Sequence, residues 1–83
     1  MLWLLFDGWY RFVAEKSFAF SFEENSEEIA FFIPKSEIGL VTRKVGGDCA
    51  ARLVPRGTRI EAVQMSAWLA KQLAEEHGLE YEK

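Results

Sequence analysis

The only cysteine and the only histidine of this chain, a classical nucleophile and a classical base, lie far apart in the sequence. Cys49 is the only cysteine and His77 is the only histidine among 83 residues. A cysteine nucleophile needs a base within hydrogen-bond reach and a third group that orients the base. No motif around either residue indicates this arrangement, and His77 falls where a cation stabilises the C-terminal end of a helix. We therefore predict a protein that is not an enzyme.

The same residue types argue against a bound metal or cofactor. One cysteine and one histidine cannot complete a zinc site, and no acidic loop has the spacing of a calcium-binding EF-hand. The pair Gly46-Gly47 lacks the Lys-Ser/Thr ending and the helix that follow in a phosphate-binding loop. We expect neither a metal nor a cofactor.

Charged residues are the second candidate for function, because their sign changes along the chain. The net charge at pH 7 is −3, but residues 1–42 carry −4, residues 43–61 carry +3 and residues 62–83 carry −2. Solvated loops and edge strands are the simplest interpretation of such runs. A functional interpretation is that carboxylates imitate the phosphates of a nucleic acid and cover a basic groove of another protein. The acidic candidates for this partner-binding role are Glu23, Glu24, Glu27, Glu28, Glu75 and Glu76.

An alternative function is binding of single-stranded nucleic acid by the basic middle of the chain. Proteins bind single strands by stacking bases on aromatic rings beside a positive groove. The aromatic candidates are Phe18, Phe20 and Phe31, although the period-two spacing of the first two is more typical of a core face. The basic candidates are Lys35, Arg43, Lys44, Arg52, Arg56 and Arg59.

Alternating hydrophobic residues predict the hairpin that carries most of the acidic candidates. Phenylalanine occupies every second position in the segment Phe18–Phe22, which predicts a strand whose phenylalanine face must be covered. A polar turn follows, with Asn25 and Ser26 at its tip. Residues 29–33 then return as an antiparallel strand that Pro34 ends, because proline cannot donate to the ladder.

The N-terminal residues permit two arrangements. Asp7-Gly8 is a hairpin turn signal, so residues 2–6 and 9–13 form two short strands in one arrangement. In the other they form a single strand, with Gly8 supplying a bulge.

Further strands are expected over residues 38–45, 49–54 and 58–63. In the last of these, Ile60 should face away from Val63, because side chains alternate between the two faces of a strand.

One helix is predicted near the C-terminus, over about residues 66–77. Ser66 suits the N-cap, because its hydroxyl can accept from the free amides of the first turn. Leu69 and Leu73 share one face, and Gly78 suits the C-terminal cap. Strands followed by one helix predict an α+β fold in a single domain over residues 1–83. We expect a curved antiparallel sheet, open or partly closed into a barrel, packed against this helix.

A cytoplasmic location is expected from the absence of targeting features. The apolar start Leu2–Phe6 is too short for a signal peptide, and no stretch approaches the roughly 18–20 apolar residues that span a bilayer. We expect no membrane partner.

Two motifs in this chain also occur together elsewhere. Residues 33–38 read Ile-Pro-Lys-Ser-Glu-Ile, and the predicted helix contains Trp68-Leu69-Ala70 and ends in Gly78-Leu79. This combination resembles a recurring pattern in small phage and mobile-element proteins, from which residues 49–57 depart. The resemblance implies a small protein in the cytoplasm of a host cell. Anti-CRISPR inhibitors are one class of such proteins, which act by occupying a host protein or ribonucleoprotein complex.

Aromatic residues are numerous for a chain of this size, at 14% of residues. The phenylalanine strand and Trp68 are expected in the core between sheet and helix. Four aromatic residues have no assigned place there, so they are candidates for an interface or for self-association: Trp3, Trp9, Tyr10 and Phe32.

Overall fold

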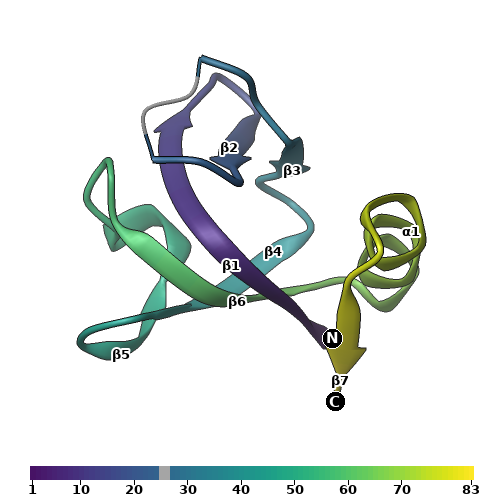
Figure 1. Cartoon of the computed structure of the whole chain (residues 1–83). Helices are drawn as coiled ribbons and strands as arrows, with labels where there is room; N and C mark the ends of the chain where they lie inside the picture. The colour runs from purple at the N-terminus through teal and green to yellow at the C-terminus, as the bar shows by residue number, and fades with distance from the viewer. Residues whose placement is uncertain (25–26) are drawn as a thin grey trace.

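Over the part of the chain that the structure describes, the fold is one curved, open sheet of seven antiparallel strands with one α-helix at its C-terminal end (Figure 1). This computed structural model describes residues 1–24 and 27–83. The predicted α+β fold is thereby confirmed, with an open sheet. The expected tip of the acidic hairpin, Asn25 and Ser26, lies outside the described residues.

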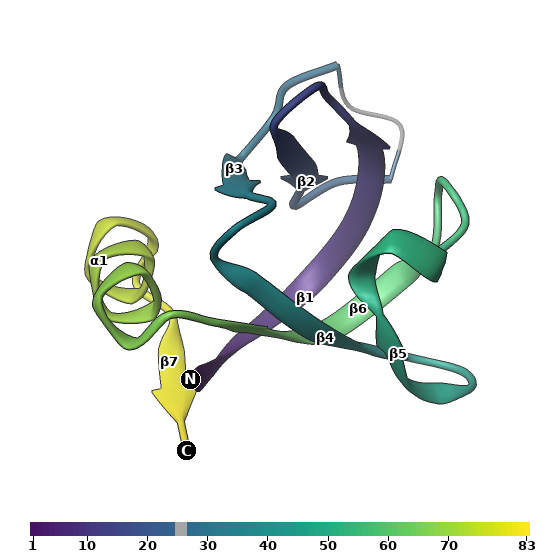
Figure 2. The ribbon, with the colours of Figure 1, turned by 180° about the vertical axis from the view of Figure 1, so that it is seen from behind.

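Six of the strands follow each other across the sheet in the order β3-β2-β1-β6-β4-β5, and β7 pairs with β1. In Figures 1 and 2 the helix and β7 lie at one side of the molecule and the β4–β5 hairpin lies at the other. The elements are β1 (Leu2–Val13), β2 (Ser17–Ser21), β3 (Phe31–Pro34), β4 (Ile38–Arg43), β5 (Gly47–Ala50), the short 3₁₀ helix η1 (Ala51–Leu53), β6 (Arg59–Met65), α1 (Ala67–His77) and β7 (Glu80–Glu82).

The N-terminal segment is one long strand, β1, so of the two predicted arrangements the single bulged strand is correct. Its pairing with β6 shifts register between Leu5 and Gly8, as a bulge requires. The backbone continues past Asp7-Gly8 without turning back. The N-terminal half of β1 pairs with β6 and β7, and its C-terminal half pairs with β2.

The β2–β3 hairpin confirms the strand pair predicted from the phenylalanine spacing. Phe18 and Phe20 are buried, and Phe20 stacks on Phe31 with 5.7 Å between ring centroids. Phe22 departs from the prediction of a fully covered phenylalanine face. It follows the last residue of β2 and keeps 41% of its surface exposed.

Strand β6 contradicts the simple alternation that the sequence predicts. Ile60 and Val63 are both completely buried and belong to the same core cluster. The pairing of β6 with β4 shifts register between Thr42 and Arg43, opposite Ala62 and Ile60. A register shift of one residue reverses the faces, which returns both side chains to the core.

The segment predicted as a strand over residues 49–54 is also different. Strand β5 ends at Ala50, and η1 follows as one short turn. Ala51 and Val54 are buried against the core, so the chain bends here to cover the sheet.

Helix α1 packs its apolar face on the sheet through Leu69, Ala70, Leu73 and Ala74. Trp68 was expected in this core, but it is 59% exposed. It precedes Leu69 by one residue, about 100° around the helix, so its side chain points away from the sheet.

The two ends of α1 differ in how well local rules predict them. Gly78 has the left-handed conformation expected of a C-terminal cap, and the Leu79 amide donates to the carbonyl of Ala74. The predicted role of the Ser66 hydroxyl is wrong, since it accepts from no amide of the first turn. It donates instead to the carboxylate of Glu37, and the Ser66 amide donates to the Glu37 carbonyl.

Candidate functional site

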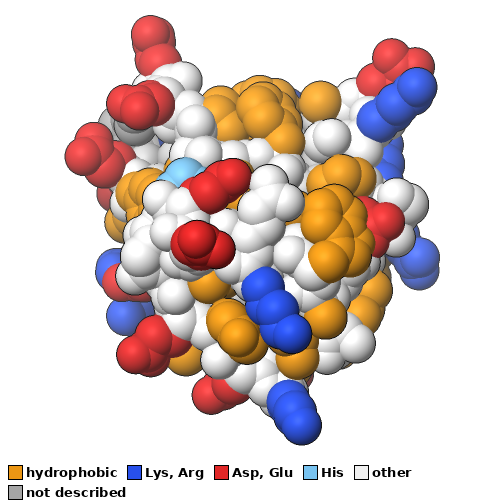
Figure 3. Space-filling view, turned by 90° about the vertical axis from the view of Figure 1, so that its right-hand side faces the viewer, with side chains coloured by type: hydrophobic (Ala, Val, Ile, Leu, Met, Phe, Trp, Pro, Cys, Tyr) orange, Lys and Arg blue, Asp and Glu red, His pale blue; other side chains and the backbone are white. Residues whose placement is uncertain are grey.

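The two segments that carry the acidic candidates, residues 23–24 with 27–28 and residues 75–76, lie close together where the β2–β3 loop faces the C-terminal end of α1. The ring of His77 lies 5.6 Å from the ring of Phe22 and 5.5 Å from that of Phe31. Glu76 precedes His77 on α1, and one of its carboxylate oxygens lies 4.0 Å from Nε2 of His77. Glutamates near residue 25 and near residue 76 therefore lie on one side of the molecule, and Figure 3 shows acidic side chains around the pale blue histidine.

A shallow hollow of about 210 Å³ marks the loop side of this region, lined by Phe22, Glu23, Glu28 and Ala30. We call the surface formed by Phe22, Glu23, Glu28, Glu76 and His77 the acidic face. Its three carboxylates come from positions about fifty residues apart in the sequence, and the contacts of His77 with two phenylalanine rings bring them together.

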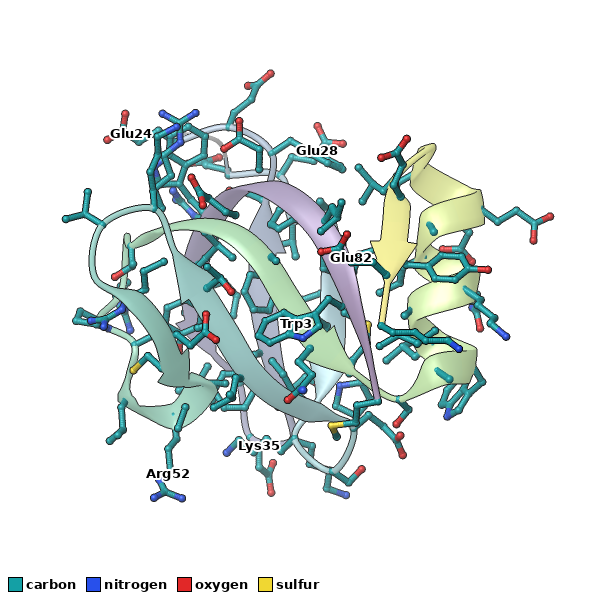
Figure 4. The ribbon with its side chains drawn as sticks, turned by 90° about the horizontal axis from the view of Figure 1, so that it is seen from below. Trp3, Glu24, Glu28, Lys35, Arg52 and Glu82 are labelled. Carbon is teal, nitrogen blue, oxygen red and sulfur yellow. The ribbon has the colours of Figure 1, made fainter. Side chains whose placement is uncertain are left out.

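The loop of the acidic face is held by hydrogen bonds at its start. The buried hydroxyl of Ser21 donates to the carbonyl of Glu23 over 2.8 Å. Arg11 donates to the carbonyl of Glu24. In Figure 4, Glu24 lies at the end of the loop that is farther from α1, and Glu28 lies nearer to the helix.

The remaining acidic candidates have fewer contacts that place them. Glu27 and Glu75 are exposed, and Glu75 neighbours Glu76 on the helix. The structure thus brings together Glu23, Glu28 and Glu76 of the six candidates.

The basic candidates do not form one positive strip. Arg43 folds back on its own turn and donates to the carbonyls of Gly46 (2.7 Å) and Gly47 (3.2 Å). Lys44 and Arg56 are exposed, and their side chains make no hydrogen bond or ion pair with other described residues.

Arg59 is also engaged inside the molecule. It donates two hydrogen bonds to the carboxylate of Asp7, at 3.1 and 3.2 Å, and its guanidinium lies 4.9 Å from the centre of the Trp9 ring. The hydrogen bond from Arg59 lowers the pKa of Asp7 below its ordinary value. Arg59 is therefore paired across 52 positions of sequence rather than left open to a nucleic acid.

The other two basic candidates, Lys35 and Arg52, border a cavity of about 470 Å³ at the open side of the sheet. We call it the open-side cavity. Its lining comes from the C-terminal half of β1, from β2, from the turn before β4 with the first two residues of β4, and from β5 with η1: Tyr10, Val13, Phe18, Lys35, Ile38, Gly39, Ala50, Ala51 and Arg52. The sequence pattern held no signal for it, because its walls come from four separate segments.

A third hollow, of about 480 Å³, lies over the outer face of the sheet. Trp3 and Leu5 of β1 form its floor with Ala62 of β6, and carboxylates of Asp48, Glu61 and Glu82 surround them. Figure 4 shows Trp3 over the sheet with Glu82 beside it. The alternation of Trp3 and Leu5 with the buried Leu4 and Phe6 is the signal that could have located this outer face.

The four aromatic residues without an assigned place have different environments. Trp3 lies in the hollow of the outer face, and Trp9 lies beneath Arg59. Phe32 is 50% exposed beside Phe12, whose ring centroid is 6.3 Å away. Tyr10 is 6% exposed and belongs to the core. Self-association through the exposed rings stays a prediction.

The described residues place no base beside the thiol of Cys49, which makes only a weak contact of 3.5 Å with the carbonyl of Ala50. Among residues 1–24 and 27–83, no cluster of three or more histidine, cysteine or acidic side chains could hold a metal ion. Over the same residues no helix is both long and apolar enough to cross a membrane.

Comparisons with known proteins found no relative. No family model matches the chain, and neither the curated proteins nor the solved structures contain a significant match. The resemblance to phage and mobile-element proteins therefore stays a prediction.

Proposed function

We propose that this chain is a non-catalytic binding protein that modulates a host complex by placing its acidic face on a basic, nucleic-acid-binding surface. The observation that supports this function is the meeting of Glu23 and Glu28 with Glu76 around Phe22 and His77. Nothing in the local sequence requires two acidic segments to share one face. Their proximity produces a larger field than either segment would alone.

The composition of the acidic face suits such a contact. Carboxylates steer a positively charged partner toward the surface and orient it. Affinity usually depends on a few buried aromatic anchors at the centre of an interface. Phe22, with 41% of its surface exposed and its ring already packed against Phe6 and His77, can supply such an anchor at little entropic cost.

The geometry gives less support to the alternative of single-stranded nucleic-acid binding. Phe18, Phe20 and Phe31 expose at most 6% of their surface, so a base cannot stack on them. Two of the six basic candidates, Arg43 and Arg59, are occupied by intramolecular hydrogen bonds.

Affinity capture from a bacterial host lysate, with competition, tests the proposal. The chain is immobilised, and bound proteins are challenged with duplex DNA, with RNA and with an increase in salt from about 0.05 M to about 0.5 M. We expect the bound protein to be released by at least one nucleic acid and by salt, because all of them compete for the same positive surface.

A pair of matched variants separates the acidic face from net charge. The triple variant Glu23→Lys, Glu28→Lys and Glu76→Lys should capture less than a tenth of the partner. Glu15→Lys, Glu61→Lys and Glu80→Lys make the same change of charge on other exposed positions and should leave capture unchanged. Equal loss in both variants, or a complex that resists both nucleic acids and salt, would show that the acidic face is not the binding surface.

A further inference from the structure

The open-side cavity combines mostly apolar walls with a rim of basic residues. Its volume, about 470 Å³, is within the range of roughly 300–1,000 Å³ that is usual for small-molecule sites. The walls are formed by Val13, Phe18 and Ile38 with small residues of β5 and η1. No carboxylate lines it, whereas acidic side chains line both other hollows.

Two cations border this cavity from different parts of the chain. Lys35 follows the end of β3, and Arg52 belongs to η1. Both are exposed, and neither side chain makes a hydrogen bond or ion pair with another residue of the described chain. Figure 4 shows the two side chains along one edge of the molecule, opposite the edge that carries Glu24 and Glu28.

The hydroxyl of Tyr10 provides a third polar group. Tyr10 lines the cavity with only 6% of its surface exposed, and its hydroxyl has no hydrogen-bond partner among the described residues. No side-chain nitrogen or oxygen of the described residues is both buried and without a partner, so this hydroxyl oxygen must be accessible to solvent. Burial also raises the pKa of Tyr10, so the hydroxyl keeps its proton near neutral pH and can donate to an anion.

We propose that the open-side cavity binds a small amphipathic anion, with its apolar body against Phe18, Val13 and Ile38. Its carboxylate or phosphate head lies between Lys35 and Arg52. Tyr10 is the available hydroxyl donor for a polar atom of the ligand inside the cavity. This site is separate from the acidic face, so it adds a function to the proposed one and does not depend on it.

A small ligand fits these observations better than a nucleic-acid strand. A strand needs a continuous series of cations along its backbone and exposed rings for its bases. The cavity has a rim of only two cations, and its two rings, Tyr10 and Phe18, are nearly buried and form walls rather than a platform.

Titrations followed by amide chemical shifts test the site directly. The probes are octanoate, octyl phosphate and uncharged octanol, which share one alkyl chain. We expect at least one anion to shift the amides of Gly39, Ala50 and Ala51, and to bind about tenfold more tightly than octanol. Comparison of the two anions distinguishes a carboxylate ligand from a phosphate ester.

The double variant Lys35→Gln and Arg52→Gln should bind the tighter-binding of the two anions about tenfold more weakly. Its affinity for octanol should be unchanged. The matched control, Lys44→Gln and Lys71→Gln, removes the same charge from exposed positions that do not line the cavity and should leave both affinities unchanged. Because all four positions are exposed, both variants should fold, which dispersed amide spectra would verify.

Three results would overturn the proposal. The first is the absence of amide shifts around the cavity with every octyl probe at millimolar concentration. The second is anion binding that is equal in the double variant and the wild type. The third is a set of amide shifts around the cavity that a single-stranded oligothymidylate causes and no octyl probe causes. The cavity would then bind a nucleic-acid strand and not a small anion.

Discussion

Gly8 lies in the middle of β1, at the register shift, with the ring of Phe6 folded over it. A methyl group at this position would come within 2.2 Å of Cζ of Phe6 and 2.4 Å of the backbone oxygen of Ser21. Phe6 is completely buried among aromatic rings, and the Ser21 oxygen is part of the backbone, so neither can move away easily.

We therefore expect Gly8→Ala to lower the free energy of unfolding by about 1–3 kcal/mol, the usual cost of overpacking a core. Denaturation in urea would measure this loss. Gly39→Ala is the matched control, because the three atoms nearest to a methyl group there belong to the flexible ends of the Gln64 and Met1 side chains. It should cost clearly less, and equal losses in the two variants would contradict the explanation.

At the scale of elements, the C-terminal end of α1 determines where His77 is placed on the acidic face. Gly78 has φ +65° and ψ +35°, and the helix stops there with the Leu79 amide bonded to Ala74. No atom lies within 4 Å of a methyl group added at Gly78, so only the backbone conformation opposes a side chain.

Gly78→Ala should therefore destabilise the fold by about 1 kcal/mol, because residues with a Cβ rarely adopt the left-handed conformation. Gly78→Asn should cost less, since asparagine tolerates this conformation better than alanine. Thermal unfolding of the two variants would measure the difference. An asparagine variant as unstable as the alanine variant would indicate that lost packing, and not backbone strain, is responsible.

At the scale of the whole molecule, the charges are separated between two edges. The β2–β3 loop carries acidic residues, and Lys35 with Arg52 borders the cavity at the opposite edge (Figure 4). Because physiological salt screens exposed charges beyond about 8 Å, the two proposed sites should act independently.

This separation predicts that the triple variant Glu23→Lys, Glu28→Lys and Glu76→Lys binds octyl phosphate within about twofold of wild type at about 0.15 M salt. Conversely, the immobilised double variant Lys35→Gln and Arg52→Gln should capture the same amount of the partner protein as the wild type does. Both measurements use the assays already described for each site. Loss of both activities in either variant would mean that the two surfaces form one site.

Local patterns in the sequence predicted the parts of the fold that depend on neighbouring residues. Period-two phenylalanines predicted β2, Pro34 predicted the end of β3, and Gly78 predicted the end of the helix. Each of these features depends on backbone geometry within a few residues, so the sequence contains the necessary information. The candidate acidic residues could be chosen from composition in the same way.

Residues distant in sequence decided the rest. The Ser66 hydroxyl bonds Glu37 because the turn before β4 reaches the start of the helix, and a local capping rule cannot include that neighbour. Arg59 lies opposite Asp7 only because β6 pairs with β1.

The meeting of the two acidic segments and the walls of the open-side cavity likewise required the tertiary structure. By itself, the sequence determined an α+β chain with a phenylalanine strand, a capped C-terminal helix and acidic and basic segments. Only the tertiary structure decided which charged side chains form ion pairs and which acidic side chains lie next to each other. The physical reason is that charge pairing and burial depend on distances between side chains, which the folded sheet sets and linear spacing does not.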